Sequence, residues 1–361
     1  MRPLSKTRSA AFVNLGLALS LAFGGTTRAA DPFAHTYSIV AQDPETGNFG
    51  VAVQSHWFQV GVLVPWAEAG VGAVTTQSFV KVEYGPDGLA LMRSGASAAE
   101  ALQRLLDADP QRQVRQVAMV DAKGRTATWT GENCVAEAGG QSGKGYSVQA
   151  NMMDKATVWP AMAEAYENAE GSFAERLLQA LEAAEGQGGD IRGRQSGALI
   201  IVSAKNTGQP WKDRLVDLRI DDHENPVREL RRLLGLHQAY ESMNAGDDAV
   251  SLGDVDKAVQ FYSRAVDLAP DIVELPFWQA VTLFLADRED EALSIFRQVF
   301  AREERWHRLI PRLPAAGLLP DDPKKIQKIL AVGPTGSAPA TGKEPPKTSE
   351  RRPVGGATSG F

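Results

Sequence analysis

The stretch TYSIVAQDPETGNFGVAVQS, residues 36–55, sets the expectation for the fold of the first part of the chain. Residues 36–43 and 49–55 are rich in strand formers, and residues 44–47 between them combine proline, a carboxylate and glycine. Turn residues between two such runs are typical of a β-hairpin. We therefore expect a hairpin here, with Thr36 leading its first strand.

Outward from this hairpin, runs of strands alternate with pairs of helices. Ser97 followed by Glu100 forms a capping-box pattern at the start of one helix. The expected strands cover 62–66, 71–76, 114–120, 126–129, 146–150, 197–202 and 215–220, and the expected helices cover 84–93, 98–109, 156–168 and 173–184. This order predicts an α+β fold with two sheets, each covered on one face by a helix pair, as a four-layer αββα sandwich at residues 31–222.

From Pro226 onward the sequence is helical and has a 34-residue period. The matching positions are Gly246 with Ala280, Leu252 with Ala286, Ala258 with Ala292, and Tyr262 with Phe296. The pattern resembles a tetratricopeptide repeat, with fewer than the three units that usually stand alone. We expect a small all-α helical-repeat module at residues 226–320, resting on the domain before it or on a helix at 227–243. Residues 333–361 are rich in Pro, Gly, Ser, Thr and Lys, which predicts a disordered tail.

Residues 1–30 are arranged like a secretory signal peptide. A basic start precedes an apolar run at residues 10–23, and small residues follow up to Ala30. The apolar run is shorter than the about 20 residues that span a bilayer, although an uncleaved anchor is the alternative. We expect a periplasmic or secreted protein with no membrane span after signal removal.

Composition argues against several classes of function. The chain has 361 residues and a net charge of −6, and no basic stripe suggests a nucleic-acid partner. Five scattered histidines and the lack of HExxH or CxxC spacing predict no metal site. No GxGxxG or GxSxG motif appears, so we expect no cofactor and no α/β-hydrolase elbow. The glycine-rich residues 139–145 lack the P-loop form and are interpreted as a flexible turn between strands.

Cys134 is the one cysteine of the chain, so the core has no internal disulfide. We interpret it as a small buried hydrophobic residue. A nucleophile or an intermolecular link are the alternatives.

The layered order of strands and helices resembles the N-terminal-nucleophile (Ntn) hydrolases, the fold class of proteasome subunits and several amidases. Within that superfamily the chain looks like the bacterial family catalogued as domain of unknown function 1028 (DUF1028), over about residues 35–222. The matching stretches are TYSIVAQDPETG (36–47), GVAVQSH (50–56), VPWA (64–67), GVGAVTTQ (70–77), YGP (84–86), QAN (149–151) and GDIRGRQS (189–196). Some members of that family are followed by a segment proposed to bind peptidoglycan, to which residues after Pro226 correspond in part.

The resemblance implies roles for specific residues. The nucleophile would be Thr36, whose α-amino group would act as the base. Ser55 and His56 end the neighbouring strand, where proteasome-type sites carry an acid–lysine pair that this chain lacks. Asn151 would support the nucleophile. The alternatives are that Thr36 is a plain strand former, His56 a packed histidine and Asn151 a helix cap.

The remaining candidates would bind substrate or complete the site. Thr76 and Gln77 end a strand where superfamily members place a backbone N–H donor for an oxyanion. Arg192 with Ser196 resembles the Arg…Ser-Gly pattern of proteasome-type subunits. Arg192, together with Arg194 and Gln195, could instead hydrogen-bond loop carbonyls.

Two hypotheses follow. The first is an exported Ntn-type amidohydrolase acting on a small-molecule or peptide amide, or a related carbonyl. It requires a cut at His35–Thr36, because signal cleavage leaves residues 31–35 ahead of Thr36. The second is a non-catalytic scaffold of the cell envelope that binds a protein or peptidoglycan through its helical repeats. Whether the chain is an enzyme, and whether it forms a homo-oligomer, stays open at this point.

Overall fold

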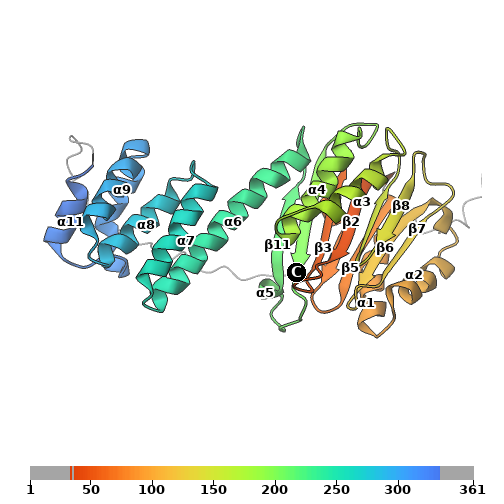
Figure 1. Cartoon of the computed structure of the whole chain (residues 1–361), viewed down its shortest axis with the longest axis horizontal. Coiled ribbons are helices and arrows are strands. Elements are labelled where there is room, and N and C mark those ends of the chain that lie inside the picture. Colours follow the sequence, from red (N-terminus) through yellow and green to blue (C-terminus); the bar gives the residue numbers. More distant parts are fainter. Residues whose placement is uncertain (1–32, 35, 334–361) are drawn as a thin grey trace, which may run out of the picture.

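The computed structural model describes residues 33, 34 and 36–333. The expected signal peptide at residues 1–30, His35 and the expected tail beyond Gly333 lie outside the described residues. The described part is a mixed α/β body followed by a helical region, as the sequence predicts (Figure 1).

Two antiparallel sheets form the α/β body. The six-stranded sheet has the order β11-β10-β3-β2-β9-β8, and the five-stranded sheet has the order β1-β5-β6-β7, with β4 paired to β5. The strands are β1 (Phe33–Ala34), β2 (Thr36–Gln42), β3 (Phe49–Ser55), β4 (Pro65–Glu68), β5 (Gly72–Phe79), β6 (Arg115–Asp121), β7 (Thr126–Thr130), β8 (Gly139–Gly143), β9 (Tyr146–Ala150), β10 (Ser196–Val202) and β11 (Arg214–Ile220).

The predicted hairpin is present, with Thr36 opposite Ser55. Its turn closes through hydrogen bonds from the Gly47 amide to the Asp43 carbonyl and from the Asp43 amide to the Asn48 carbonyl, both 2.8 Å long. Gly47 has φ 75°, a left-handed conformation that glycine adopts without steric cost.

Each sheet packs a helix pair on its outer face (Figure 1). Helices α3 (Val158–Asn168) and α4 (Phe173–Gly186) cover the six-stranded sheet, and α1 (Tyr84–Arg93) and α2 (Ala98–Asp107) cover the other. Aliphatic side chains from both sheets form a separate cluster between them, which includes Val40, Val51, Ala73, Ala118 and Ile200. The predicted capping box of Ser97 and Glu100 is present at α2.

Two local predictions were wrong. Residues 139–143 form strand β8 rather than a turn, paired with β9 from Gly139 opposite Ala150 to Gly143 opposite Tyr146. The strand expected at 62–66 is instead a 3-10 turn at Val60–Val62 followed by β4. Pro65, which cannot donate to a ladder, stands at the first position of that strand.

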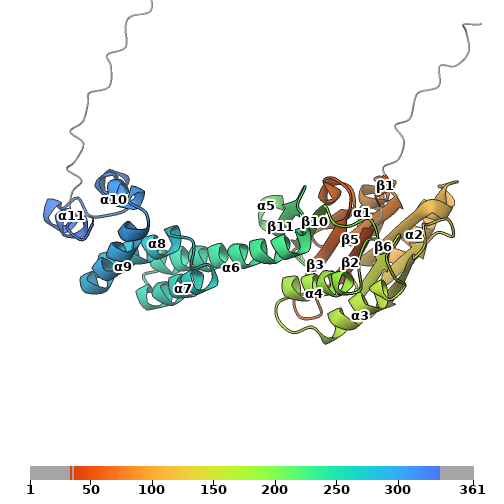
Figure 2. The ribbon, with the colours of Figure 1, turned by 90° about the horizontal axis from the view of Figure 1, so that it is seen from above.

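The helical region begins with α6 (Pro226–Ser251), one long helix that runs from the α/β body to the remaining helices (Figure 2). Val227, Leu230 and Leu234 near its start join the core beneath α4. The helices that follow are α7 (Val255–Leu268), α8 (Glu274–Leu285), α9 (Glu289–Arg302), α10 (Arg305–Leu309) and α11 (Pro323–Leu330). The small four-residue helix α5 (Pro210–Asp213) precedes β11.

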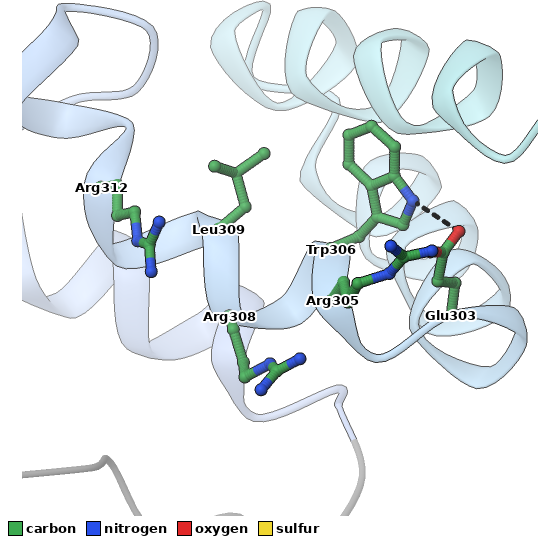
Figure 3. A pocket seen from close by; sticks show the side chains of 6 residues that line it. All are labelled: Glu303, Arg305, Trp306, Arg308, Leu309 and Arg312. Carbon is green, nitrogen blue, oxygen red and sulfur yellow. Dashed lines mark hydrogen bonds and ion pairs between the residues drawn. The ribbon is translucent and has the colours of Figure 1, made fainter.

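A separate core, rich in aromatic side chains, holds the last helices together. Phe277, Phe296 and Phe300 are buried in it, and Trp306 of α10 packs against Phe277 with ring centroids 4.6 Å apart. Figure 3 shows the Trp306 indole nitrogen donating a hydrogen bond of 3.2 Å to the Glu303 carboxylate. Of the helices described, none is both long and apolar enough to cross a membrane.

Residues 221–225 connect β11 to α6 and are bonded to two loops of the α/β body. The Gln59 amide donates to the Asp221 carbonyl at 3.1 Å, and the Gln195 side chain donates to the Asp222 carboxylate at 3.1 Å. The His223 amide donates back to the Gln195 carbonyl at 2.7 Å. The start of α6 is therefore fastened to the loops that follow β3 and precede β10.

Candidate functional site

Four polar residues lie side by side where neighbouring strands of the six-stranded sheet begin or end. Ser196, Ser55 and Thr36 are register partners on β10, β3 and β2. Asn151 directly follows β9, and its backbone N–H donates to the Thr36 carbonyl at 3.1 Å. All four are fully buried. Neighbouring strands therefore bring together residues that are far apart in the sequence.

A second polar row faces them from the other sheet. Gln77, Gln116 and Thr130 are register partners on β5, β6 and β7. The Gln77 amide nitrogen donates to the Thr36 carbonyl at 3.0 Å and to the Gln116 side-chain oxygen at 2.7 Å. The Asn151 amide nitrogen donates to the same Gln116 oxygen at 2.9 Å. The two sheets are thus joined by hydrogen bonds at the start of β2.

These contacts fix the peptide group of Thr36. Its carbonyl accepts from the Gln77 side chain and from both the backbone and the side chain of Asn151. Buried, charge-neutral networks of this kind hold a group in one geometry, because any other leaves polar atoms unsatisfied. The backbone that carries the Thr36 side chain is therefore held in one position.

The network continues one step deeper between the sheets. The Ser38 hydroxyl donates to the Gln77 side-chain oxygen at 2.6 Å and accepts from the Gln149 amide at 3.0 Å. Gln149 also contacts the Thr75 hydroxyl. Gln116, Ser38, Gln149 and Thr75 were not predicted as site residues. Their signal in the sequence is alternation, since Thr75 and Ser38 stand two positions from the predicted Gln77 and Thr36 and so share their strand faces.

His56 and Arg192 meet at Asp190, a carboxylate that the sequence analysis did not single out. The Arg192 guanidinium binds Asp190 through Nε at 3.0 Å and Nη2 at 2.7 Å, and the His56 backbone N–H donates to Asp190 at 3.2 Å. The His56 ring lies 3.4 Å from the Arg194 carbonyl. Arg192 therefore holds the loop beside Ser55 in place through the nearly buried Asp190.

The other predicted residues have bonds within the body. The Thr76 backbone N–H donates to the Val64 carbonyl at 3.2 Å. Because the Thr76 side chain lies on the opposite face of β5 from Gln77, its hydroxyl donates to the Lys81 carbonyl at 3.1 Å. The Ser196 hydroxyl bonds the Trp57 carbonyl and the Val60 amide. Arg194 pairs with Glu185, and Gln195 bonds the Asp222 side chain.

The two residues of β1 belong to the second sheet and pair with the end of β5, close to the start of β2. Phe33 pairs with Phe79 and Ala34 with Ser78 of β5, whereas Thr36 begins β2 of the other sheet. The residues on either side of position 35 thus belong to different sheets. Ser78 has φ 72°, an uncommon conformation for a residue with a side chain.

The comparisons with known proteins agree on a family. A family model described as a family of unknown function (DUF1028) matches residues 36–230. The chain belongs to the DUF1028 family. Among solved structures, the crystal structure of protein SPO2555 from Silicibacter pomeroyi, also described as DUF1028, has 31% sequence identity and a TM-score of 0.50. The match covers 55% of this chain and 88% of that one. No curated protein matches the chain.

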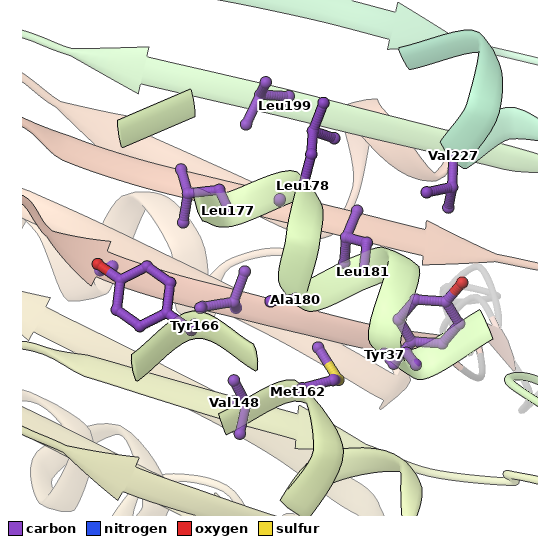
Figure 4. Packing of buried hydrophobic residues seen from close by; sticks show 14 of the residues in the cluster. Tyr37, Val148, Met162, Tyr166, Leu177, Leu178, Ala180, Leu181, Leu199 and Val227 are labelled. Carbon is purple, nitrogen blue, oxygen red and sulfur yellow. The ribbon is translucent and has the colours of Figure 1, made fainter. Parts of the chain in front are cut away.

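The DUF1028 match contains every residue of the two polar rows. Tyr37, which follows Thr36, points to the outer face of β2, where Figure 4 shows it beside Leu181 of α4. Its hydroxyl bonds Glu185. Burial raises the pKa of Tyr37 well above its ordinary value and the Glu185 carboxylate adds to this, so the phenol stays protonated and cannot act as a base.

Cys134 of the DUF1028 region lies 3.4 Å from the Arg115 carbonyl, to which its thiol donates. Burial raises the pKa of this thiol, which argues against a nucleophilic role at neutral pH. In the described part of the chain, no group of three or more His, Cys, Asp or Glu residues could hold a metal ion.

A pocket of about 560 Å³ borders the network of the DUF1028 region. Its wall includes Thr130 and Gly139, and the Gln116 amide donates to the Thr130 hydroxyl at 2.9 Å and to the Gly139 carbonyl at 3.2 Å. Gln116 therefore stands between this pocket and the residues that hold Thr36. Glu132 and Glu137 supply the charged side chains of the pocket wall.

Proposed function

We propose that this protein is an exported hydrolase of the N-terminal-nucleophile type, with Thr36 as the nucleophile and an amide or related carbonyl compound as the substrate. The observation that carries the proposal is the anchored start of β2, where Gln77 and Asn151 hold the Thr36 carbonyl between two sheets. The proposal includes a four-layer αββα sandwich of the Ntn type and removal of the signal peptide and of residues 31–35.

The chemistry would proceed in two steps. The Thr36 hydroxyl oxygen forms a bond to the substrate carbonyl carbon, and its proton passes to the Thr36 α-amino group. The C–N bond then breaks as that proton moves to the leaving nitrogen. Water hydrolyses the resulting ester, which releases a carboxylic acid and restores Thr36.

Supporting groups follow from the geometry. The Thr76 backbone N–H already donates a hydrogen bond to the Val64 carbonyl. We therefore assign the oxyanion donors to the backbone N–H groups around Gln77 and Ser78. Backbone in sparsely populated conformations, as at Ser78, often occurs at functional sites. Ser55 at the end of β3 and Asn151 directly after β9 flank Thr36, where they would orient its amino and hydroxyl groups.

Intact mass and N-terminal sequencing of the protein from an exporting host test the proposal. We expect a mature chain that begins at Thr36. Thr36→Ala should keep residues 31–35 if the cut is autocatalytic, and it should abolish hydrolysis of amide substrates while leaving the melting temperature nearly unchanged. Thr46→Ala, in the turn at the far end of the same hairpin, serves as the control: it removes a hydrogen bond to Asp43 but should leave both the cut before Thr36 and amide hydrolysis as in wild type.

A wild-type chain that still begins near Ala30 or Asp31 would contradict the proposal, because Thr36 would then have no α-amino group. The envelope-scaffold role, with tetratricopeptide-like repeats as the binding part, would be the remaining explanation.

A further inference from the structure

Outside the candidate site, the helical region contains a pocket of about 640 Å³. It is lined by Glu303, Arg305, Trp306, Arg308, Leu309 and Arg312 (Figure 3). Three guanidinium groups and an indole thus surround one hollow, and a single carboxylate lies among them.

The pocket is built on a firmly anchored segment. Ile310 and Leu313 are buried in the aromatic core, and Trp306 packs on Phe277. His307 contacts Phe300 edge-on, with centroids 5.0 Å apart, and lies 3.0 Å from the Leu330 carbonyl. The backbone that presents the arginines is therefore fixed before any ligand arrives, which lowers the entropic cost of binding.

The arginines themselves point to solvent and differ in their partners. Arg305 pairs with Glu303, which also holds the Trp306 indole. Across residues 36–333, no hydrogen bond or ion pair engages the guanidinium of Arg308 or Arg312, and both are exposed. Two cationic forks beside an apolar wall of Trp306 and Leu309 are thus available to an anionic ligand.

We propose that this pocket binds an acidic peptide segment, in which carboxylates engage Arg308 and Arg312 and a neighbouring apolar side chain lies against Trp306 and Leu309. Guanidinium and carboxylate groups match in a bidentate geometry, and Trp and Arg are enriched among the residues that contribute most to binding at protein interfaces. This inference does not depend on the proposed chemistry of Thr36.

Extended polyanions fit the pocket less well. Nucleic-acid binding usually neutralises many phosphates along a basic surface, whereas here three arginines stand in a chain of net charge −6. An anionic membrane likewise requires a larger basic cluster. A short acidic peptide has the few carboxylates and the apolar side chain that three guanidinium groups and one apolar wall can bind.

The test uses the full mature chain and a fluorescein-labelled peptide, Glu-Glu-Leu-Glu-Glu, in fluorescence anisotropy at low salt. We expect saturable binding that weakens as salt rises, because exposed charges are screened. The double variant Arg308→Gln/Arg312→Gln should raise the Kd by about tenfold or more. The matched control Arg264→Gln/Arg297→Gln removes two exposed arginines of α7 and α9 outside the pocket and should bind as wild type.

Two further probes complete the experiment. A peptide with glutamine in place of glutamate should not bind, and equal melting temperatures of the two double variants would show that both are folded. The proposal is overturned if the acidic peptide does not bind saturably, or if Arg308→Gln/Arg312→Gln leaves its affinity unchanged. It is also overturned if anionic phospholipid vesicles or a single-stranded oligonucleotide, and not the peptide, bind through these arginines.

Discussion

Gln116 bonds to both sides of the candidate site. Its side-chain oxygen accepts from Gln77 and Asn151, and its amide nitrogen donates to the Thr130 hydroxyl and the Ala150 carbonyl. At the scale of single residues, this one side chain connects Thr36 to the neighbouring pocket wall. The sequence analysis named Thr36, Gln77 and Asn151, which share this hydrogen-bond network, but not Gln116, because nothing local to a strand shows which distant amides its side chain will meet.

Gln116→Met should therefore be costly. It removes the shared acceptor of two buried amides, and unsatisfied buried groups cost about 1–3 kcal/mol each, so we expect a loss of about 3 kcal/mol in the free energy of unfolding. Chemical denaturation measures it. Gln103→Met on the exposed face of α2 is the control and should change stability by less than about 0.5 kcal/mol. A loss below about 1 kcal/mol for Gln116→Met would refute the importance of the network.

Cys134 gives a prediction on pH dependence. Burial raises the pKa of its thiol, so at any pH near 8 the thiolate fraction is smaller than for an ordinary cysteine. Alkylation by iodoacetamide, followed by mass spectrometry, should reach its half-maximal rate at a higher pH in the folded chain than in the urea-unfolded chain. The same half-maximal pH in the folded and the unfolded chain would show that this shift is absent.

At the scale of elements, most strands and helices could be predicted from the sequence, whereas strand β8 and the bounds of β4 could not. Its residues GGQSG carry no hydrophobic pattern. The glycines are required by packing, because a Cβ on Gly139 would lie 2.5 Å from the Trp159 ring and one on Gly143 would lie 2.2 Å from the Tyr146 ring. Contacts with residues outside the strand therefore determine that these five residues form a strand, and the local sequence pattern does not show those contacts.

The start of α4 carries a second capping box. The Ser172 hydroxyl accepts from the Glu175 amide, and the Ser172 amide donates to the Glu175 carboxylate at 2.7 Å. Although partial burial pushes the pKa of Glu175 upward, the bonds from the Ser172 backbone and hydroxyl keep it below its ordinary value. The cap therefore stabilises the fold above the ordinary pKa of glutamate, and this stabilisation is lost as the pH falls through the lowered value.

Ser172→Ala should reduce the free energy of unfolding at pH 7 by about 1 kcal/mol. The difference from wild type should shrink as the pH falls below the ordinary pKa of glutamate and through the lowered pKa of Glu175, and denaturation at a series of pH values measures it. Thr157→Ala is the control, since Thr157 precedes α3 without capping it through its side chain. A Ser172→Ala effect that is no larger than that of Thr157→Ala would contradict the prediction.

At the scale of the whole molecule, α6 belongs to both parts of the chain. Its first turns complete the core beneath α4, and its later turns pack against α7. Leu230→Ala should cost about 2–5 kcal/mol and speed hydrogen exchange in β10, β11 and α4 more than in α8 and α9. Leu252→Ala is the control, because Leu252 is 85% exposed. Equal exchange rates in wild type and Leu230→Ala would show that α6 is dispensable to the α/β body.

The long helix α6 also acts as a lever. Its 26 residues rise by about 39 Å, so a tilt of about 10° at its fastened start displaces its far end by about 7 Å. Residues 221–225 form the fixed end of this lever. They are hydrogen-bonded to Gln59 and Gln195, which lie in the same loops as His56 and Arg194. A force applied at the last helices would therefore reach the loops beside the candidate site through these hydrogen bonds, with a smaller displacement and a larger magnitude than at the far end of α6.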